Sequence, residues 1–293
     1  MVKKKLILIV GPTASGKTDY SISLAEKYSC PIISCDSRQI YKELKIGTAP
    51  PDKEQLKRVK HYFIFSHSVI SHYTAGLYEV EALELINELF KTYDTLVAVG
   101  GSGLYADALC YGIDDFPPAD LELRESIMEK LSKEGIESLR GELKLLDRES
   151  YDSIDIANSQ RVVRALEVTL QTGRKFSSFK KDCAKQRPFI IEKRLLERPR
   201  AELYERIDRR VDKMMKDGLL DEVRGLLPFK HLSALKTVGY RELFDYLDGK
   251  IALKEAVDLI KRNSRRYAKR QMTWWRRDKD VTSHVDIIKE ANL

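Results

Sequence analysis

Residues 11–18 form a glycine-rich phosphate-binding motif, and this motif constrains the fold more than any other feature of the chain. An apolar run, residues 6–10, precedes the motif, and a helical pattern follows it. A strand must deliver such a loop and a helix N-terminus must receive the anion, so the setting supports the match. The sequence predicts a di- or triphosphate site, with Lys17 on the distal phosphate and the Thr18 hydroxyl on Mg²⁺. The motif fills every fixed position of G-x-x-x-x-G-K-[ST] with Gly11, Pro12, Thr13, Ala14, Ser15, Gly16, Lys17 and Thr18.

The first 116 residues alternate between strand and helix patterns. This alternation is typical of a parallel sheet flanked by helices, so we predict an α/β fold of the P-loop NTPase-like type. Ligands of such sheets bind beyond the carboxyl ends of the strands. The patterns predict strands at 6–10, 31–35, 61–65 and 95–99, and helices at 18–28 and 77–90.

A helical insertion interrupts this alternation at the segment Phe116-Pro117-Pro118. The pattern stays helical to residue 188, returns as a strand at 189–196, and is then helical to about residue 277. We therefore predict a core of residues 1–116 and 189–293, with an inserted all-helical domain, 117–188. Within the insertion, residues 157–188 carry 8 Lys or Arg against 2 Asp or Glu. This excess favours contact with a polyanion.

Composition narrows the functional class. The 293 residues carry a net charge of +7, and no apolar run approaches the roughly 18 residues that span a bilayer. No secretory cleavage site follows the N-terminal lysines, so we expect a cytoplasmic protein without a membrane partner. The cysteines at 30, 35, 110 and 183 match no zinc-site spacing. Cys35 is best interpreted as a small buried residue.

The segment Asp36-Ser37-Arg38-Gln39 follows the second predicted strand. Three interpretations of Asp36 stay open: a Mg²⁺ ligand, a general base, or a cap for the next helix. Ser37 and Gln39 supply donors and acceptors suited to a base edge, which favours base recognition and proton removal. The turn Gly100-Gly101-Ser102-Gly103 follows another strand, either as a tight turn or as a place where a ligand approaches the backbone.

Basic residues gather in three later segments. Arg161 and Arg164 share one face of a predicted helix, as do Arg206 and Arg210 of a later helix. Eight of the seventeen residues in 261–277 are basic and none is acidic, which favours binding of nucleic-acid phosphates. Trp274 and Trp275 could stack on bases, but each taken singly is expected in the core.

Several motifs occurring in one order make the chain similar to the bacterial type of the tRNA dimethylallyltransferase (tRNA isopentenyltransferase) family. The resemblance covers nearly the whole chain and adds the segments Ile40-Tyr41, Gly47-Thr48-Ala49, Leu104-Tyr105, Gln160–Glu167, Val238–Arg241 and Lys269–Trp274 to the motifs above.

The resemblance implies transfer of a dimethylallyl group from dimethylallyl diphosphate to N6 of the adenosine at tRNA position 37. It implies that Asp36 is the general base, that Thr13 contacts the reacting end, and that Arg210 joins Lys17 and Mg²⁺ in stabilising diphosphate. The partner would be the anticodon stem-loop, clamped by the inserted domain, and the enzyme a monomer. The implied tRNA contacts are Asp36, Ser37, Arg38, Gln39, Ser102, Arg124, Gln160, Arg161, Val162, Val163, Arg164, Lys236, Thr237, Val238, Gly239, Tyr240 and Arg241.

Three alternatives remain open from the sequence. The motif also suits an ATP-binding nucleoside or metabolite kinase, or an RNA-binding protein whose phosphate loop is a regulatory switch. An adenylate isopentenyltransferase would share the donor but act on free nucleotide. The basic segments disfavour this last alternative, because a free nucleotide needs few such charges.

Overall fold

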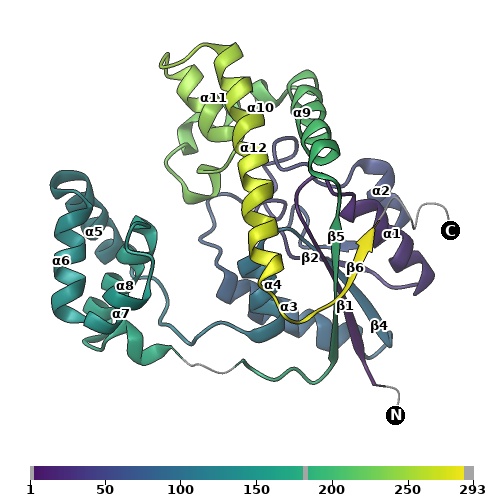
Figure 1. Ribbon diagram of the computed structural model, residues 1–293, viewed down its shortest axis with the longest axis horizontal. Helices are drawn as coiled ribbons and strands as arrows, with labels where there is room; N and C mark the ends of the chain where they lie inside the picture. The colour runs from purple at the N-terminus through teal and green to yellow at the C-terminus, as the bar shows by residue number, and fades with distance from the viewer. Residues whose placement is uncertain (1–2, 181–183, 287–293) are drawn as a thin grey trace. The chain divides into compact units, whose positions relative to one another are not determined.

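The computed structural model describes residues 3–180 and 184–286, and the larger of its two units is built on a six-stranded sheet (Figure 1). The strands lie in the order β3-β2-β4-β1-β5-β6, and every pairing is parallel. The predicted α/β class is confirmed. The strands are β1 (Lys5–Val10), β2 (Ile32–Ser34), β3 (His61–Tyr62), β4 (Thr95–Val99), β5 (Ile190–Glu197) and β6 (Val281–Asp286).

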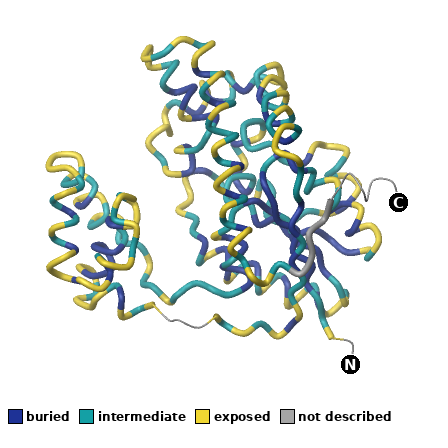
Figure 2. The backbone as a smooth tube through the Cα atoms, viewed as in Figure 1, coloured by how far each residue is buried: buried dark blue, intermediate teal, exposed yellow. Residues whose placement is uncertain are grey.

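Burial explains the position of β1 inside the sheet. Residues 6–10 are all fully buried, as the dark tube in Figure 2 shows. A strand covered on both faces needs an uninterrupted apolar run instead of alternation, and this segment supplies one. The structure contains all five predicted strands. It also contains β6, which the sequence did not predict because residues 281–286 are mostly polar and directly follow a long helical pattern.

Two compact units make up the chain. One comprises Met1–Gly112 and Gln186–Leu293, and the other is Ile113–Lys185. The sequence-based boundaries, after residues 116 and 188, differ from these by a few residues. Phe116 belongs to the helical unit because its ring stacks on Phe176, with centroids 4.5 Å apart. Arg187 belongs to the sheet unit, where it donates to the carbonyls of Ala108 and Leu109.

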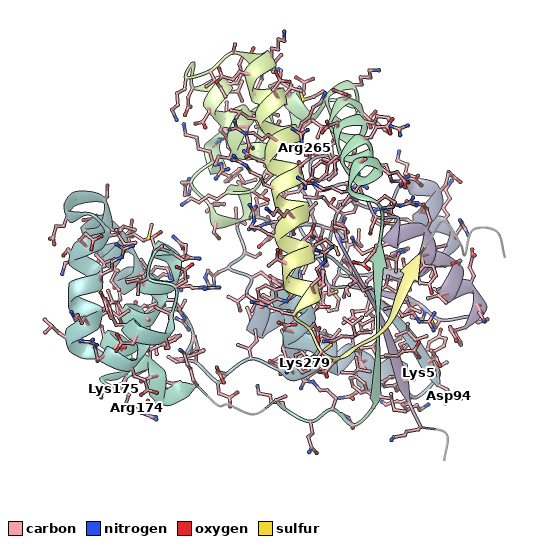
Figure 3. All side chains as sticks on the ribbon, in the orientation of Figure 1. Lys5, Asp94, Arg174, Lys175, Arg265 and Lys279 are labelled. Atoms are coloured by element: carbon pink, nitrogen blue, oxygen red, sulfur yellow. The ribbon has the colours of Figure 1, made fainter. Side chains whose placement is uncertain are left out.

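The helices of the sheet unit include a long C-terminal pair, α9 and α12, which pack against each other. Arg265 of α12, labelled in Figure 3, forms an ion pair with Asp208 of α9. None of the helices that the structure describes is long and apolar enough to cross a bilayer. The helices are α1 (Lys17–Lys27), α2 (Lys53–Arg58), α3 (Ala75–Leu89), α4 (Gly103–Tyr111), α9 (Arg200–Lys216), α10 (Leu219–Gly225), α11 (Tyr240–Leu247) and α12 (Leu253–Arg276), with the short 3-10 turns η2 (Leu227–Phe229) and η3 (Ser233–Leu235).

An apolar cluster joins these C-terminal helices to the segment that follows β2. Ile40 and Leu44 are fully buried there against Leu219, Tyr240 and Leu243. Burial of this kind contributes roughly 1.5–3 kcal/mol for each large apolar side chain. The cluster therefore fixes the segment after Asp36 onto the helices α10 and α11.

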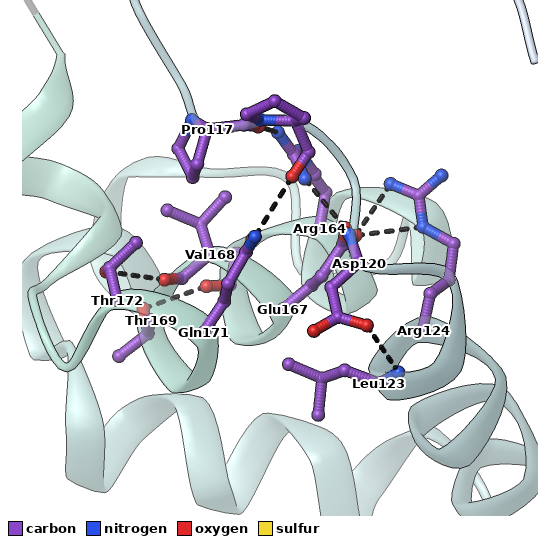
Figure 4. A network of polar contacts seen from close by, with 12 residues as sticks. Pro117, Asp120, Leu123, Arg124, Arg164, Glu167, Val168, Thr169, Gln171 and Thr172 are labelled. Carbon is purple, nitrogen blue, oxygen red and sulfur yellow. Dashed lines mark hydrogen bonds and ion pairs between the residues drawn. The ribbon is translucent and has the colours of Figure 1, made fainter.

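The helical unit has its own apolar core. Leu139, Val162 and Leu166 are fully buried in it. A buried carboxylate, Glu167, adds polar contacts: it accepts from Arg124 at 2.6 Å and from Arg164 at 2.8 Å (Figure 4). The elements of this unit are α5 (Leu121–Glu134), α6 (Ile136–Leu146), α7 (Arg148–Ser153), α8 (Ser159–Thr172) and the 3-10 turn η1 (Phe176–Phe179).

Candidate active site

Three loops of the sheet unit line one cavity of about 740 Å³. They are the phosphate loop after β1, the segment from Asp36 after β2, and the turn from Gly100 after β4. These strands are neighbours in the order β2-β4-β1, so the topology brings their carboxyl ends together. Residues of α9 and α12 complete the lining, among them Arg210 and Gln271.

The phosphate loop has the backbone conformation that its glycines predict. Gly11 and Gly16 have φ values of 146° and 102°, and α1 begins at the next residue, Lys17. Residues with a Cβ atom rarely adopt such φ angles, whereas glycine does so without strain. Ser15 Oγ is buried and has no hydrogen-bond partner among the residues that the structure describes. An anion in the loop would give this hydroxyl an acceptor.

Lys17 is the first residue of α1, and its ammonium group is turned back onto the backbone of the loop. Its Nζ donates to Gly11 O at 3.0 Å and to Pro12 O at 2.7 Å. Burial, and then the positive charge of Arg210, lower the pKa of Lys17 to about 8, although the Asp36 carboxylate partly opposes this shift. A bound diphosphate would favour the charged form of Lys17.

Three arginines contact the phosphate loop from the β5–α9 side. Arg198 Nε donates to Ser15 O at 2.7 Å, and Arg206 Nε donates to Ala14 O at 2.8 Å. Arg210 Nη1 donates to Thr13 Oγ1 at 2.9 Å. The sequence analysis did not select Arg198. Its position just after β5 could have indicated a contact with the phosphate loop, because β5 pairs with β1, the strand that precedes this loop. Arg209 points elsewhere: its side chain is 68% exposed and pairs with Glu205.

Asp36 lines the same cavity and caps the turn that follows it. Its Oδ1 accepts from Arg38 N at 2.8 Å and from Gln39 N at 3.2 Å. The expected helix does not follow Asp36: the carboxylate caps a turn instead, and this cap occupies one of its oxygens. Among the described residues no group of three or more His, Cys, Asp or Glu side chains could hold a metal ion, so Asp36 belongs to no such group. Within the described residues Oδ2 accepts no hydrogen bond, so it is available to a ligand in the cavity.

Ser102 and Gln39 hold loops together. Ser102 Oγ accepts from Ser37 N at 3.0 Å and lies 3.0 Å from Ser37 Oγ. The Gln39 amide donates to the carbonyls of Thr48 and Ala49 at 3.1 and 2.9 Å. Cys35, just before these loops, is fully buried, and burial raises its thiol pKa, as expected of a packing residue. The described cysteines 30, 35 and 110 are free and buried, while residue 183 lies outside the described residues.

The segment 236–241 reaches the cavity, but its central residue is structural. Lys236 and Arg241 are exposed and line the cavity with Thr237, Val238 and Gly239. Tyr240, in contrast, is 0% exposed and donates to Glu222 at 2.6 Å. A Cβ atom at Gly47 would lie 2.6 Å from the Tyr240 ring, so this close approach requires glycine. Tyr240 is corrected from a tRNA contact to a packing residue.

Glu222 is a positioning group that no motif in the sequence marks. Its carboxylate accepts from the backbone N–H groups of Lys45, Ile46 and Gly47 at 2.8 to 3.1 Å. Together with the Tyr240 hydroxyl, these donors satisfy both of its oxygens. Glu222 thereby holds the loop from residue 45 to residue 47 at the rim of the cavity.

In the helical unit the predicted contact residues divide into three groups. Val162 and Val163 are 0% and 2% exposed, so their side chains pack in the core and present nothing to a ligand. Arg164 donates to Glu167 and to Pro117 O, and Arg124 donates to Glu167. Gln160 and Arg161 are exposed. Of these predicted contacts, Gln160 and Arg161 are the two whose exposure suits a tRNA contact.

The helix α12 contributes both a basic surface and a buried side. Arg262, Arg266 and Arg270 are exposed at intervals of four residues, as the helical spacing predicts. Trp275 is 1% exposed, which confirms its assignment to the core. Trp274 is half-buried and carries the Arg277 guanidinium over its ring at 4.1 Å.

Comparison with known proteins gives one consistent result. A sequence model of the IPP transferase family matches residues 39–278. The chain is 50% identical to tRNA dimethylallyltransferase 1 of Bacteroides thetaiotaomicron, over 94% of this chain and 90% of that protein. It is 51% identical to tRNA dimethylallyltransferase 2 of Porphyromonas gingivalis, over 94% and 92%. Its structure is similar to that of tRNA isopentenylpyrophosphate transferase from Bacillus halodurans, with a TM-score of 0.69 at 36% identity, over 98% and 93% of the two chains.

Proposed function

The chain belongs to the IPP transferase family, and on this basis we propose that it transfers a dimethylallyl group from dimethylallyl diphosphate to adenosine N6 in tRNA. The proposed acceptor is the adenosine at position 37, beside the anticodon. Diphosphate is the second product. The protein is a transferase, and the relatives named above are tRNA dimethylallyltransferases.

The observation that carries this proposal is that Lys17, Arg210 and Asp36 line a single cavity. The two cations suit a diphosphate, because charge-assisted hydrogen bonds to phosphate oxygens are strong and directional. The carboxylate suits an amine that must lose a proton. A phosphate loop used in this way holds the leaving diphosphate of the prenyl donor, and it does not bind a nucleotide for cleavage.

The proposed reaction is a displacement at C1 of the dimethylallyl group. Adenosine N6 forms the new bond to C1, while the C1–O bond breaks and its electron pair leaves with diphosphate. The N6 proton passes to Asp36, whose Oδ2 is the oxygen not used to cap the turn. Lys17 and Arg210 stabilise the negative charge that grows on diphosphate as the bond breaks. The Thr13 hydroxyl, which accepts from Arg210, is the proposed contact to the reacting end of the donor.

We propose Mg²⁺ as the metal that accompanies diphosphate. The donor set fits this ion: Thr18 lines the cavity directly after Lys17 and offers one hydroxyl oxygen. Mg²⁺ keeps several waters and binds through one or two protein oxygens together with phosphates, so it needs no acidic cage. Thr18 would hold the ion, which when bound neutralises charge on the diphosphate.

We propose that the tRNA partner is the anticodon stem-loop and that the enzyme acts on it as a cytoplasmic monomer. Unstacked loop bases can enter an active site that a helical base cannot reach. Lys236 and Arg241 at the cavity and the exposed arginines of α12 supply cations for the RNA backbone. Gln160 and Arg161 are the contacts proposed for the helical unit.

Nucleoside mass analysis tests this function. The protein is incubated with unmodified tRNA, Mg²⁺ and dimethylallyl diphosphate, and a parallel sample receives ATP in place of the prenyl donor. The proposal predicts a gain of one C5H8 unit on adenosine, located beside the anticodon by fragment mapping, only with the prenyl donor. Phosphate transfer from ATP without modified adenosine would support a kinase and overturn the proposal. Modification of free adenylate in preference to tRNA would point to the nucleotide-specific enzyme.

A further inference from the structure

A buried glutamine of α12, Gln271, bonds two of the loops that line the cavity. Its Oε1 accepts from Thr13 N at 2.8 Å, and its Nε2 donates to Gly101 O at 2.9 Å. The partners fix which end of the amide faces each loop, because a backbone N–H can only donate and a carbonyl can only accept. Gln271 therefore joins the phosphate loop to the turn after β4.

The surroundings of Gln271 match this role. The side chain is 5% exposed, and Ala268 and Trp275, its neighbours at helical spacing, are also buried. A buried amide costs free energy unless both of its ends are bonded, as they are here. A Cβ atom at Gly101 would lie 2.3 Å from Nε2, so only glycine leaves room for the bond.

The bond from Thr13 has a consequence for the phosphate loop. The N–H groups of such a loop are generally directed at the anion. The Thr13 N–H is directed at Gln271 instead, while its Oγ1 accepts from Arg210 at 2.9 Å. Thr13 is thus held from two sides, with its backbone bonded to α12 and its side chain bonded to α9.

We propose that Gln271 is a positioning residue for the transfer reaction: it fixes Thr13, and through Thr13 the guanidinium of Arg210, against the leaving diphosphate. This inference rests on the proposed function. The same helix carries the exposed Arg266 and Arg270, so one rigid element serves both the RNA surface and the phosphate loop. Misplacement by about 1 Å in such a site can reduce a rate by about 10²-fold.

The first test replaces Gln271 by methionine, which keeps the length of the side chain and removes both hydrogen bonds. Gln271→Met is expected to lower kcat by about 10- to 100-fold, with the KM for tRNA changed less than about threefold. Gln171→Met makes the same chemical change at an exposed position of the helical unit and is expected to leave kcat unchanged. Full kcat in Gln271→Met, alongside an active wild-type enzyme, would overturn the inference and leave the proposed function intact.

A double-mutant cycle distinguishes positioning from a general loss of stability. If Gln271 acts through Thr13, then Gln271→Met lowers kcat less than about threefold in a Thr13→Ala background, because the group that it positions is already absent. If the two reductions multiply in full, Gln271 does not act through the Thr13 side chain.

A measurement on the wild-type protein covers the case in which Gln271→Met does not fold. Amide hydrogen exchange, followed by NMR, is expected to show a protected Thr13 N–H both without ligand and with inorganic diphosphate. Exchange at the rate of an unprotected amide would contradict the bond to Gln271. Absence of prenyl transfer by the wild type, with Thr13 still protected, would contradict the proposed function alone.

Discussion

Arg210 Nη1 donates to Thr13 Oγ1 at 2.9 Å, and this bond joins α9 to the phosphate loop. The two residues are separated by 197 positions in the sequence. Burial, and then the charge of Arg206, lower the pKa of Arg210, but an arginine keeps its charge at any physiological pH. The bond therefore places a permanent positive charge beside Thr13, in the loop that would hold the diphosphate.

Removing this charge should impair use of the donor. Arg210→Ala is expected to lower kcat/KM for dimethylallyl diphosphate by about 10²-fold, because a charge that stabilises the leaving group is lost. The matched control is Arg209→Ala on the same helix, since Arg209 is 68% exposed and is expected to change kcat/KM less than twofold. Equal effects of the two substitutions in steady-state assays would rule out a specific role for Arg210.

Asp36 permits a test that separates the base from the cap. Asp36→Asn retains an oxygen that can accept from Arg38 N and Gln39 N, but it cannot take a proton at neutral pH. We expect turnover to fall by at least about 10²-fold while tRNA affinity, measured by filter binding, stays within about threefold. Turnover close to that of the wild type would refute the assignment of Asp36 as the general base.

The lowered pKa of Lys17 predicts a pH dependence of donor binding. In the free enzyme Lys17 titrates at about pH 8, below which it is charged. As the pH rises above this value, the neutral amine predominates, and donor affinity is expected to fall by up to about tenfold per pH unit. The measurement is KM for dimethylallyl diphosphate between pH 6.5 and 9.5. In Lys17→Met the donor should bind weakly at every pH, and persistence of the same pH dependence there would assign it to another group.

The ion pairs of Glu167 are expected to stabilise the helical unit. This carboxylate is 0% exposed and pairs with Arg124 and Arg164, whose side chains are 32% and 27% exposed. Glu167→Gln is expected to destabilise the unit by about 2 kcal/mol, less than for a fully buried pair because water still reaches the arginines. Amide exchange in α5 and α8 should accelerate accordingly. Asp152→Asn, which removes an exposed pair with Arg148, should leave that exchange unchanged.

The exposed arginines of α12 predict a salt effect. Arg266→Gln is expected to weaken tRNA binding and to lower the slope of log affinity against log salt concentration by about 1. Arg224→Gln, at an exposed pair with Asp221 on α10, serves as the control. An unchanged slope in Arg266→Gln would show that this face of α12 does not contact RNA.

The sequence predicted those parts of the site that local motifs encode. The phosphate loop, the segment at Asp36 and the turn at Gly100 each follow a strand, and adjacency of β2, β4 and β1 explains why they meet. Contacts between distant segments were not predictable in this way. Gln271 lies 258 positions from Thr13, and Glu222 lies 177 from Lys45, so no spacing rule links them.

Burial explains the remaining differences between prediction and structure. Val162, Val163 and Tyr240 belong to motifs of the family, but membership of a motif does not distinguish a packing residue from a ligand contact. The strand β6 was missed because its residues carry little apolar periodicity, and its pairing with β5 becomes visible only in three dimensions.

If the phosphate loop holds a leaving diphosphate, the number of diphosphates released must equal the number of adenosines modified. Diphosphate release and adenosine modification are measured in the same samples, with dimethylallyl diphosphate, tRNA and Mg²⁺, in the presence of radiolabelled ATP. One diphosphate is expected for each adenosine modified, with the ATP unchanged. Release of phosphate from ATP without modification of adenosine would show that the loop does not hold a leaving diphosphate.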